Sequence, residues 1–172
     1  MSVLKYDFKQ YLVALRILHL ALVAAVVVFG AVVHFVLLPL PDFQPNQNSV
    51  LFVNLSAVYL VFAATIGYWL FGNQLKTAKK LKTLNDKLNA YRSASIVRFA
   101  LLEGAALVAI VFYLLTGNIV LLGIAGIGLL VLLLAHPNPT KLKDHLDLSQ
   151  AELARLEDPT KQVASSTLMK RF

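Results

Sequence analysis

The sequence predicts an all-α fold: a polytopic membrane protein built as a four-transmembrane-helix bundle, with a cytoplasmic helical hairpin and a short helical tail. Of its 172 residues, 58% are hydrophobic and 15% are charged, against roughly 25% charged residues in a soluble domain. The mean hydropathy is +0.70, and four long apolar runs account for it. This composition excludes a disordered chain and argues against a soluble domain, because charge is too scarce to cover a surface.

The four apolar runs cover about residues 11–40, 51–72, 94–115 and 118–135. A span needs about 20 mostly apolar residues, and backbone groups in lipid must be hydrogen-bonded within the segment, so each run is predicted to be one helix. The first run is too long for a signal peptide and is followed by prolines, so we expect it to be retained. Residues 1–136 would then form a transmembrane domain, and residues 137–172 a tail.

The distribution of basic residues sets the expected direction of the helices. The connections at 41–50 and 116–118 contain no Lys or Arg, whereas the 73–93 connection and the tail are rich in both. Basic loops remain on the cytoplasmic side of a membrane. We therefore expect both termini and the 73–93 connection to be cytoplasmic.

The 73–93 connection lacks Gly and Pro and is predicted to be a helical hairpin that turns near Asn85 and Asp86. Its basic side chains are expected to contact anionic lipid headgroups or a partner protein: Lys76, Lys79, Lys80, Lys82, Lys87 and Arg92. No aromatic platform lies among them, so nucleic acid is not an expected partner.

The tail is predicted to contain short helices. Ser149 with Glu152 fits a capping box, and Thr140 is a candidate cap for a helix with Leu142 and Leu146 on one side. Three further leucines are expected to pack against the membrane or a partner: Leu148, Leu153 and Leu156.

Ionisable residues inside a span are costly, about 2.5–3.5 kcal/mol each on insertion scales, and so they are functional candidates. Glu103 falls near the middle of the third run. Stripes on the first and second runs bring Arg16, His19 and Thr65 to a similar depth, which predicts a polar cluster of these four residues. Arg98 is instead expected to extend toward the cytoplasm.

Three interpretations of Glu103 remain open. A buried Glu can be held protonated or paired only to fix helix packing; it can carry protons, an ion or a small ligand; or it can contact another subunit. Three glycines of the fourth run are expected to allow close helix approach: Gly123, Gly126 and Gly128.

Neither a cofactor nor a metal is expected. His19 and His34 have the spacing of haem ligands, but the only candidate partner, His136, is expected more than a turn below His19. No nucleotide loop, nucleophile motif or HExxH motif occurs, so catalysis is not expected.

Two segments resemble parts of small, uncharacterised four-helix proteins of the bacterial inner membrane: SASIVRFALLEGAALVAIVFYLLTGN and HPNPTKLKDHLDLSQAE. The resemblance implies a fold and a bacterial cytoplasmic (inner) membrane location, and no activity. Glu103 after a polar loop is also faintly similar to the rotor-ring proteolipid of ATP synthases. The loop lacks the Arg-Gln-Pro motif of that family and two further helices are present, so no rotor function is transferred.

Three functions follow as hypotheses. The first is a non-enzymatic subunit or interaction protein of a membrane complex, bound to other subunits or to a second copy of itself. The second is a small proton-coupled transporter or channel-like protein that uses Glu103. The third is an electron-transfer or quinone-binding membrane subunit.

Overall fold

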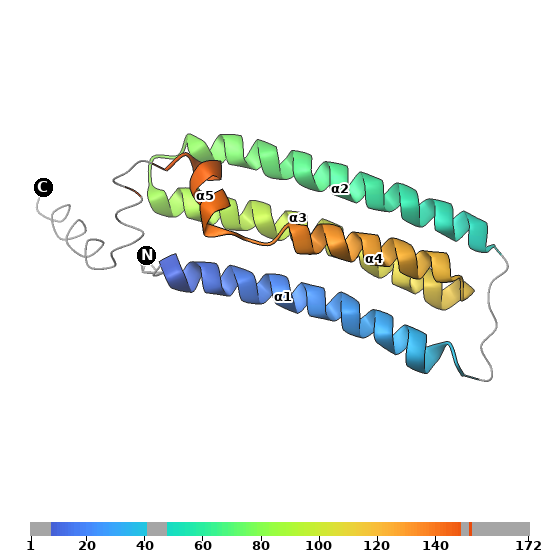
Figure 1. Cartoon of the computed structure of the whole chain (residues 1–172). Helices are drawn as coiled ribbons and strands as arrows, with labels where there is room; N and C mark the ends of the chain where they lie inside the picture. Colours follow the sequence, from blue (N-terminus) through green and yellow to red (C-terminus); the bar gives the residue numbers. More distant parts are fainter. Residues whose placement is uncertain (1–7, 41–47, 149–151, 153–172) are drawn as a thin grey trace, which may run out of the picture.

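The computed structural model describes residues 8–40, 48–148 and 152, and this part of the chain is helical without a strand. The elements are α1 (Phe8–Val32), the π-helical segment η1 (Val33–Leu37), α2 (Ser49–Lys79), α3 (Leu84–Thr116), α4 (Ile119–Leu134) and α5 (Pro139–Leu146). Figure 1 shows the long helices running side by side. The prediction of an all-α bundle is confirmed.

Three helices are long and apolar enough to cross a membrane: Tyr11–Leu37, Ser49–Lys79 and Leu84–Thr116. The fourth predicted span, α4, has only 16 residues, which is about 24 Å at 1.5 Å per residue. That is shorter than the roughly 30 Å of hydrocarbon in a bilayer. As a result α4 stops well short of the end that α2 and α3 reach (Figure 1).

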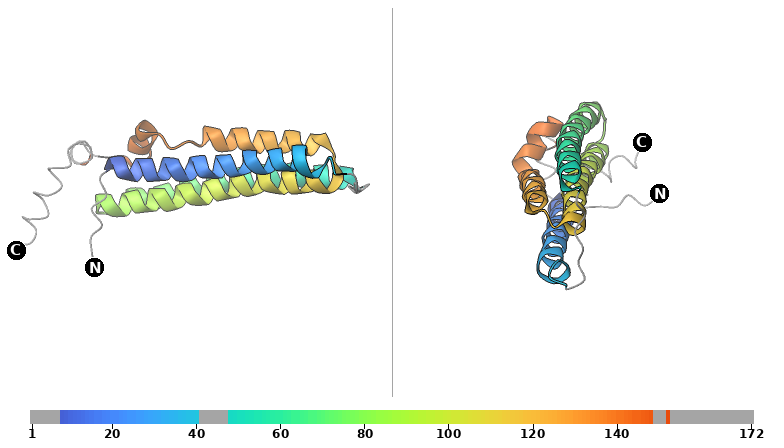
Figure 2. Two further views of the ribbon diagram at one scale, coloured as in Figure 1. Left: turned by 90° about the horizontal axis from the view of Figure 1, so that it is seen from below. Right: turned by 90° about the vertical axis from the view of Figure 1, so that its right-hand side faces the viewer.

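Helix α3 is the centre of the bundle. It packs against α2 and α4 and, along a third side, against α1. The end-on view in Figure 2 places α1 on the side of the bundle away from α2. Gly30 of α1 lies against Ile110, and Gly128 of α4 lies against Ala106. These contacts fix the level of each helix along α3.

The face that α2 buries differs from the stripe that its polar residues marked. The sequence stripe contained Asn54, Thr65 and Tyr68, and all three are exposed. The buried residues repeat at helical spacing on the opposite side: Ser56, Leu60, Ala63, Gly67, Phe71, Leu75 and Ala78. Small residues are common on this face because they let α2 and α3 approach closely. The buried face of α2 is therefore marked by side-chain size, whereas the sequence stripe was chosen by side-chain polarity.

The predicted helical hairpin is present, with its turn slightly earlier than expected. Helix α2 ends at Lys79 and α3 begins at Leu84, so the turn precedes Asn85. Thr83 is the N-cap: its hydroxyl accepts a hydrogen bond from the Asp86 amide (3.1 Å) and donates to the Asp86 carboxylate (2.6 Å). This reciprocal cap places the N-cap of α3 two residues before Asn85, where the turn was expected.

The first tail helix also forms, and Leu142 and Leu146 are fully buried on one side, as predicted. Its start differs, because Pro139 is the first helical residue and the Leu142 amide donates to the carbonyl of Asn138 (3.0 Å). Proline suits a first helical position, since its missing N–H would have no partner there. Ser149, Leu153 and Leu156 lie outside the described residues.

Of the three α4 glycines, Gly128 is the one that another helix approaches. A Cβ at Gly128 would lie 3.2 Å from the Cβ of Ala106 and 3.4 Å from Leu60 Cδ1, whereas Gly123 and Gly126 have nothing within 4 Å. We therefore expect Gly128→Leu to lower the free energy of unfolding by about 1–3 kcal/mol through overpacking. Thermal unfolding in detergent measures this. Gly126→Leu is the control, and an equal loss in both variants would contradict the packing proposed for Gly128.

Candidate functional site

The end of the bundle that holds the α2–α3 turn is called here the basic end. Five of its six expected contact residues are exposed: Lys76, Lys79, Lys80, Lys82 and Arg92. The sixth, Lys87, is partly buried and forms an ion pair with Glu152 (2.8 Å), which attaches the tail to α3. The exposed lysines form a solvated basic surface.

Arg98 extends toward the basic end, the direction expected from the sequence, since its Cγ lies beside Gly67 and its guanidinium beside Phe71, one turn nearer the α2–α3 turn. What the sequence did not predict is that the side chain lies inside the protein. Arg98 is 8% exposed, and its Nη2 donates a hydrogen bond to the carbonyl of Ala135 (2.9 Å). The guanidinium carbon is 4.0 Å from the centre of the Phe71 ring. The last carbonyls of a helix lack partners within the helix and carry partial negative charge, so a cation is stabilised there. The early end of α4 is thus what draws Arg98 inward.

His19 is buried beside this arginine. It is 1% exposed, its ring centre is 4.8 Å from that of Phe99, and it lies 5.4 Å from the ring centre of His136. Neither ring nitrogen of His19 has a hydrogen-bond partner among the residues that the structure describes. The expectation that His136 lies more than a turn below His19 was wrong, because the short α4 ends level with the middle of α1.

A cavity of about 300 Å³ opens next to Arg98. It lies between α2, α3, the last turn of α4 and α5, where a longer α4 would have filled the space. Eight residues line it: Tyr68, Phe71, Tyr91, Arg98, Leu134, Ala135, His136 and His145. The tyrosine, arginine and histidine side chains among them can donate hydrogen bonds. We call this space the Arg98 cavity.

The predicted cluster of Arg16, His19, Thr65 and Glu103 is not assembled by the described contacts. His19 faces Phe99, and Gly30 faces Ile110, so residues of α1 and α3 that are 80 positions apart share a level. Arg16 is then level with residue 96, seven residues from Glu103, which is about 10 Å along the axis. No described hydrogen bond or ion pair joins any two of the four residues.

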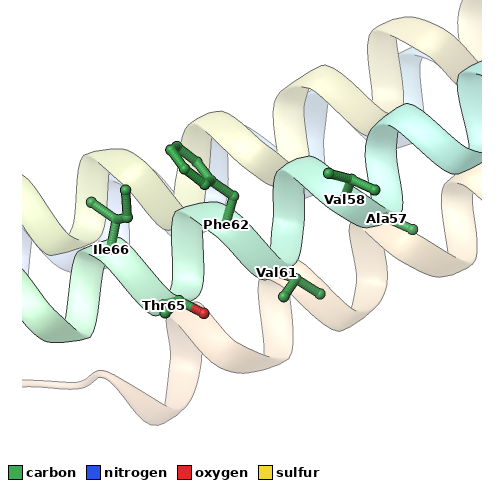
Figure 3. Close-up of a pocket in the computed structure, with 6 residues that line it drawn as sticks. All are labelled: Ala57, Val58, Val61, Phe62, Thr65 and Ile66. Carbon is green, nitrogen blue, oxygen red and sulfur yellow. The ribbon is translucent and has the colours of Figure 1, made fainter.

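Thr65 is separated from the other three by its direction. It is exposed on α2 and lines a wide, almost wholly apolar depression whose lining comes from that helix alone. Figure 3 shows the six lining side chains along α2: Ala57, Val58, Val61, Phe62, Thr65 and Ile66. A surface of this kind suits lipid chains, and it offers Glu103 no polar partner.

The first-helix stripe is only partly correct. His19 and Gly30 are buried, Arg16 and His34 are partly buried, and Val27 is 50% exposed. His34 has a partner at the other end of the bundle, because its Nδ1 lies 2.7 Å from the Tyr113 hydroxyl. The two histidines therefore differ in a respect that matters for stability: of the pair, His34 is hydrogen-bonded and His19 is not, among the described residues.

Sequence reasoning missed the residues that surround the Arg98 cavity. Two signals pointed to them. The fourth apolar run is the shortest of the four, and His136 and Pro137 follow it at once. When a short helix packs beside longer ones, its last carbonyls lie at a level where the longer helices continue. Arg98 lies at the level of the last carbonyls of α4.

Comparison with protein-family models, with curated proteins and with solved structures found no match. The chemistry of the site therefore has to be argued from its own residues.

The two histidines give a direct test of the site's energetics. A buried polar group without a partner costs about 1–3 kcal/mol, whereas a hydrogen-bonded one contributes stability. His19→Leu should leave the free energy of unfolding unchanged or raise it by about 1 kcal/mol. His34→Leu is the matched control and should lower it by a similar amount, since it leaves the Tyr113 hydroxyl unpaired. Thermal unfolding in detergent at fixed pH compares them. A large loss for His19→Leu would mean that the histidine has a partner outside the described contacts.

Proposed function

We propose that this chain is a non-enzymatic subunit of a membrane complex and that Glu103 contacts another chain in the membrane. The proposal includes four spans, with α4 as the shortest. Polar groups flank α4 at both ends, Asn118 as its N-cap and His136 after its last turn, as expected of a helix that crosses from one interface to the other. The location proposed is the bacterial inner membrane, with both termini cytoplasmic.

The observation that supports this function is the position of Glu103. It lies on α3 one turn from Phe99 and Ala106, both of which are buried. Glu103 itself is only partly buried, and no hydrogen bond or ion pair to it is found in the described part of the chain. It is thus at the margin of the surface that α3 presents to α1, where a neighbouring chain has access.

Energetics favours a partner for this residue. A carboxyl group within hydrocarbon is costly, and such residues normally face protein. Residues 8–40, 48–148 and 152 provide Glu103 with no hydrogen bond or ion pair, so a second subunit or a second copy is the simplest source. The proton-coupled transporter is less well supported, because no chain of polar side chains among the described residues leads away from Glu103.

Cross-linking tests the proposed contact. A photo-crosslinking amino acid at Leu107, one turn from Glu103 on the same helix, should capture a discrete partner in native membranes. The same probe at Val61, on the outer face of α2 and 66% exposed, should not. Glu103→Leu should reduce the Leu107 adduct about tenfold, the size expected for one charge-assisted hydrogen bond. A Leu107 adduct that is unchanged by Glu103→Leu would contradict the role of this carboxyl group.

The transporter hypothesis gives a different result in the same variants. If Glu103 carries protons, Glu103→Gln abolishes flux in proteoliposomes while the Leu107 adduct persists. For the electron-transfer hypothesis, a haem would be visible as a Soret band in the purified protein.

The threading is tested with cysteines, because the chain has none of its own. Asn46→Cys should react with an impermeant thiol reagent in intact spheroplasts, and Lys82→Cys should react only after the cells are opened. The physical reason is that five of the six basic side chains of residues 73–93 are exposed at one end of the bundle, and basic connections remain cytoplasmic. The reverse labelling pattern would invert the topology.

A further inference from the structure

We propose that the Arg98 cavity binds the phosphate group of an anionic phospholipid from the membrane leaflet at the basic end. This site is separate from Glu103 and from the exposed lysines, and it does not depend on the function proposed above. Its argument rests on charge, on depth and on the shape of the opening.

The first step is the charge of the lining. Arg98 is more than nine-tenths buried, yet the one ion pair found among the described residues joins Lys87 to Glu152. The Ala135 carbonyl occupies one donor of a guanidinium that has five. Arg98 Nε is buried without a hydrogen-bond partner. An arginine in this state retains both charge and donors for an anion.

The second step is the chemistry around the arginine. Two phenols, Tyr68 and Tyr91, and two imidazoles, His136 and His145, line the same cavity, and its lining in the described part of the chain includes no carboxylate. Phosphate oxygens are strong acceptors, and a planar guanidinium beside phenol O–H and imidazole N–H groups suits them. The lining thus favours an oxyanion over a cation or a neutral apolar ligand.

The third step is depth. Arg98 is eighteen residues before Thr116, the last residue of α3, which is about 27 Å along the helix. That distance is close to the roughly 30 Å thickness of bilayer hydrocarbon. If Thr116 marks one edge of the hydrocarbon, Arg98 lies near the other edge, at the level of lipid phosphates.

The fourth step distinguishes a lipid from free phosphate. Leu134 lines the cavity and is 74% exposed, and Leu130, one turn further along α4, is 60% exposed. A polar chamber whose rim continues into an apolar helix face matches a phosphate with acyl chains attached. The acyl chains would follow α4 toward the middle of the membrane.

Lipid titration of the full chain tests the site. Protein delipidated in a neutral maltoside detergent is titrated with phosphatidylglycerol, phosphatidylcholine or inorganic phosphate, and retained lipid is counted by native mass spectrometry alongside thermal unfolding. We expect phosphatidylglycerol to be retained and to raise the unfolding temperature, while phosphatidylcholine binds about tenfold more weakly. Inorganic phosphate should not reproduce the effect at the same concentration.

Variants locate the binding. Arg98→Gln should weaken phosphatidylglycerol binding about tenfold, as expected for one lost charge-assisted contact. Arg92→Gln, an exposed arginine on the same helix and one of the expected headgroup contacts, is the matched control and should weaken binding by no more than about twofold, because an exposed charge contributes little. His136→Ala changes an exposed lining residue, so it should fold normally and bind more weakly. If Arg98→Gln does not fold, the binding measured for His136→Ala decides whether the lipid occupies the cavity.

Three results would overturn the proposal. Equal binding of the two phospholipids would exclude recognition of anionic lipid. An equal effect of inorganic phosphate would make the ligand a free anion. An equal loss in Arg92→Gln, or full binding in His136→Ala, would assign the lipid to the basic surface and exclude the cavity.

Discussion

The hydrogen bond from Arg98 to the Ala135 carbonyl is the interaction on which the basic end of the bundle depends. Helix α4 stops where α2 and α3 still have several turns to run, so its last carbonyls would be buried without partners. The guanidinium satisfies one of them while stacking over Phe71. The same early stop leaves the space in which α5 packs and the Arg98 cavity opens. The short length of α4 therefore accounts for both the buried position of Arg98 and the cavity beside it.

Much of the fold was predictable because it follows from properties that are local in sequence. Apolar run length identified the first three long helices, and the absence of Gly and Pro between 73 and 93 identified the hairpin. The turn itself was predicted near Asn85 and Asp86, whereas the cap at Thr83 places it just before them. In the tail, the spacing of Leu142 and Leu146 was enough to predict that they share one side of a short helix, and the structure buries that side of α5.

The site was not predictable by the same means, because it depends on how far each helix extends relative to its neighbours. The depth of a residue in the bundle, counted from the edge of its own apolar run, places His136 more than a turn below His19, whereas their rings are in contact. The polar stripe on α2 failed for a related reason. In a membrane bundle, small residues such as Ala63 and Gly67 mark the packed face, while an exposed Thr side chain such as Thr65 is tolerated on the outside. Polarity alone does not reveal which way a transmembrane helix faces.

The position of α1 has a consequence for biogenesis. It packs mainly against α3 and lies on the side of the bundle away from α2 (Figure 2). During synthesis α1 leaves the ribosome long before α3, so it enters the bilayer without its principal neighbour. In that interval His19 has no Phe99 to cover it. Helices α2 and α3, which a short capped turn joins, can pack against each other as soon as both have been made. Helix α1 is thus made before α2 and α3 and packs against α3 only after both have been made.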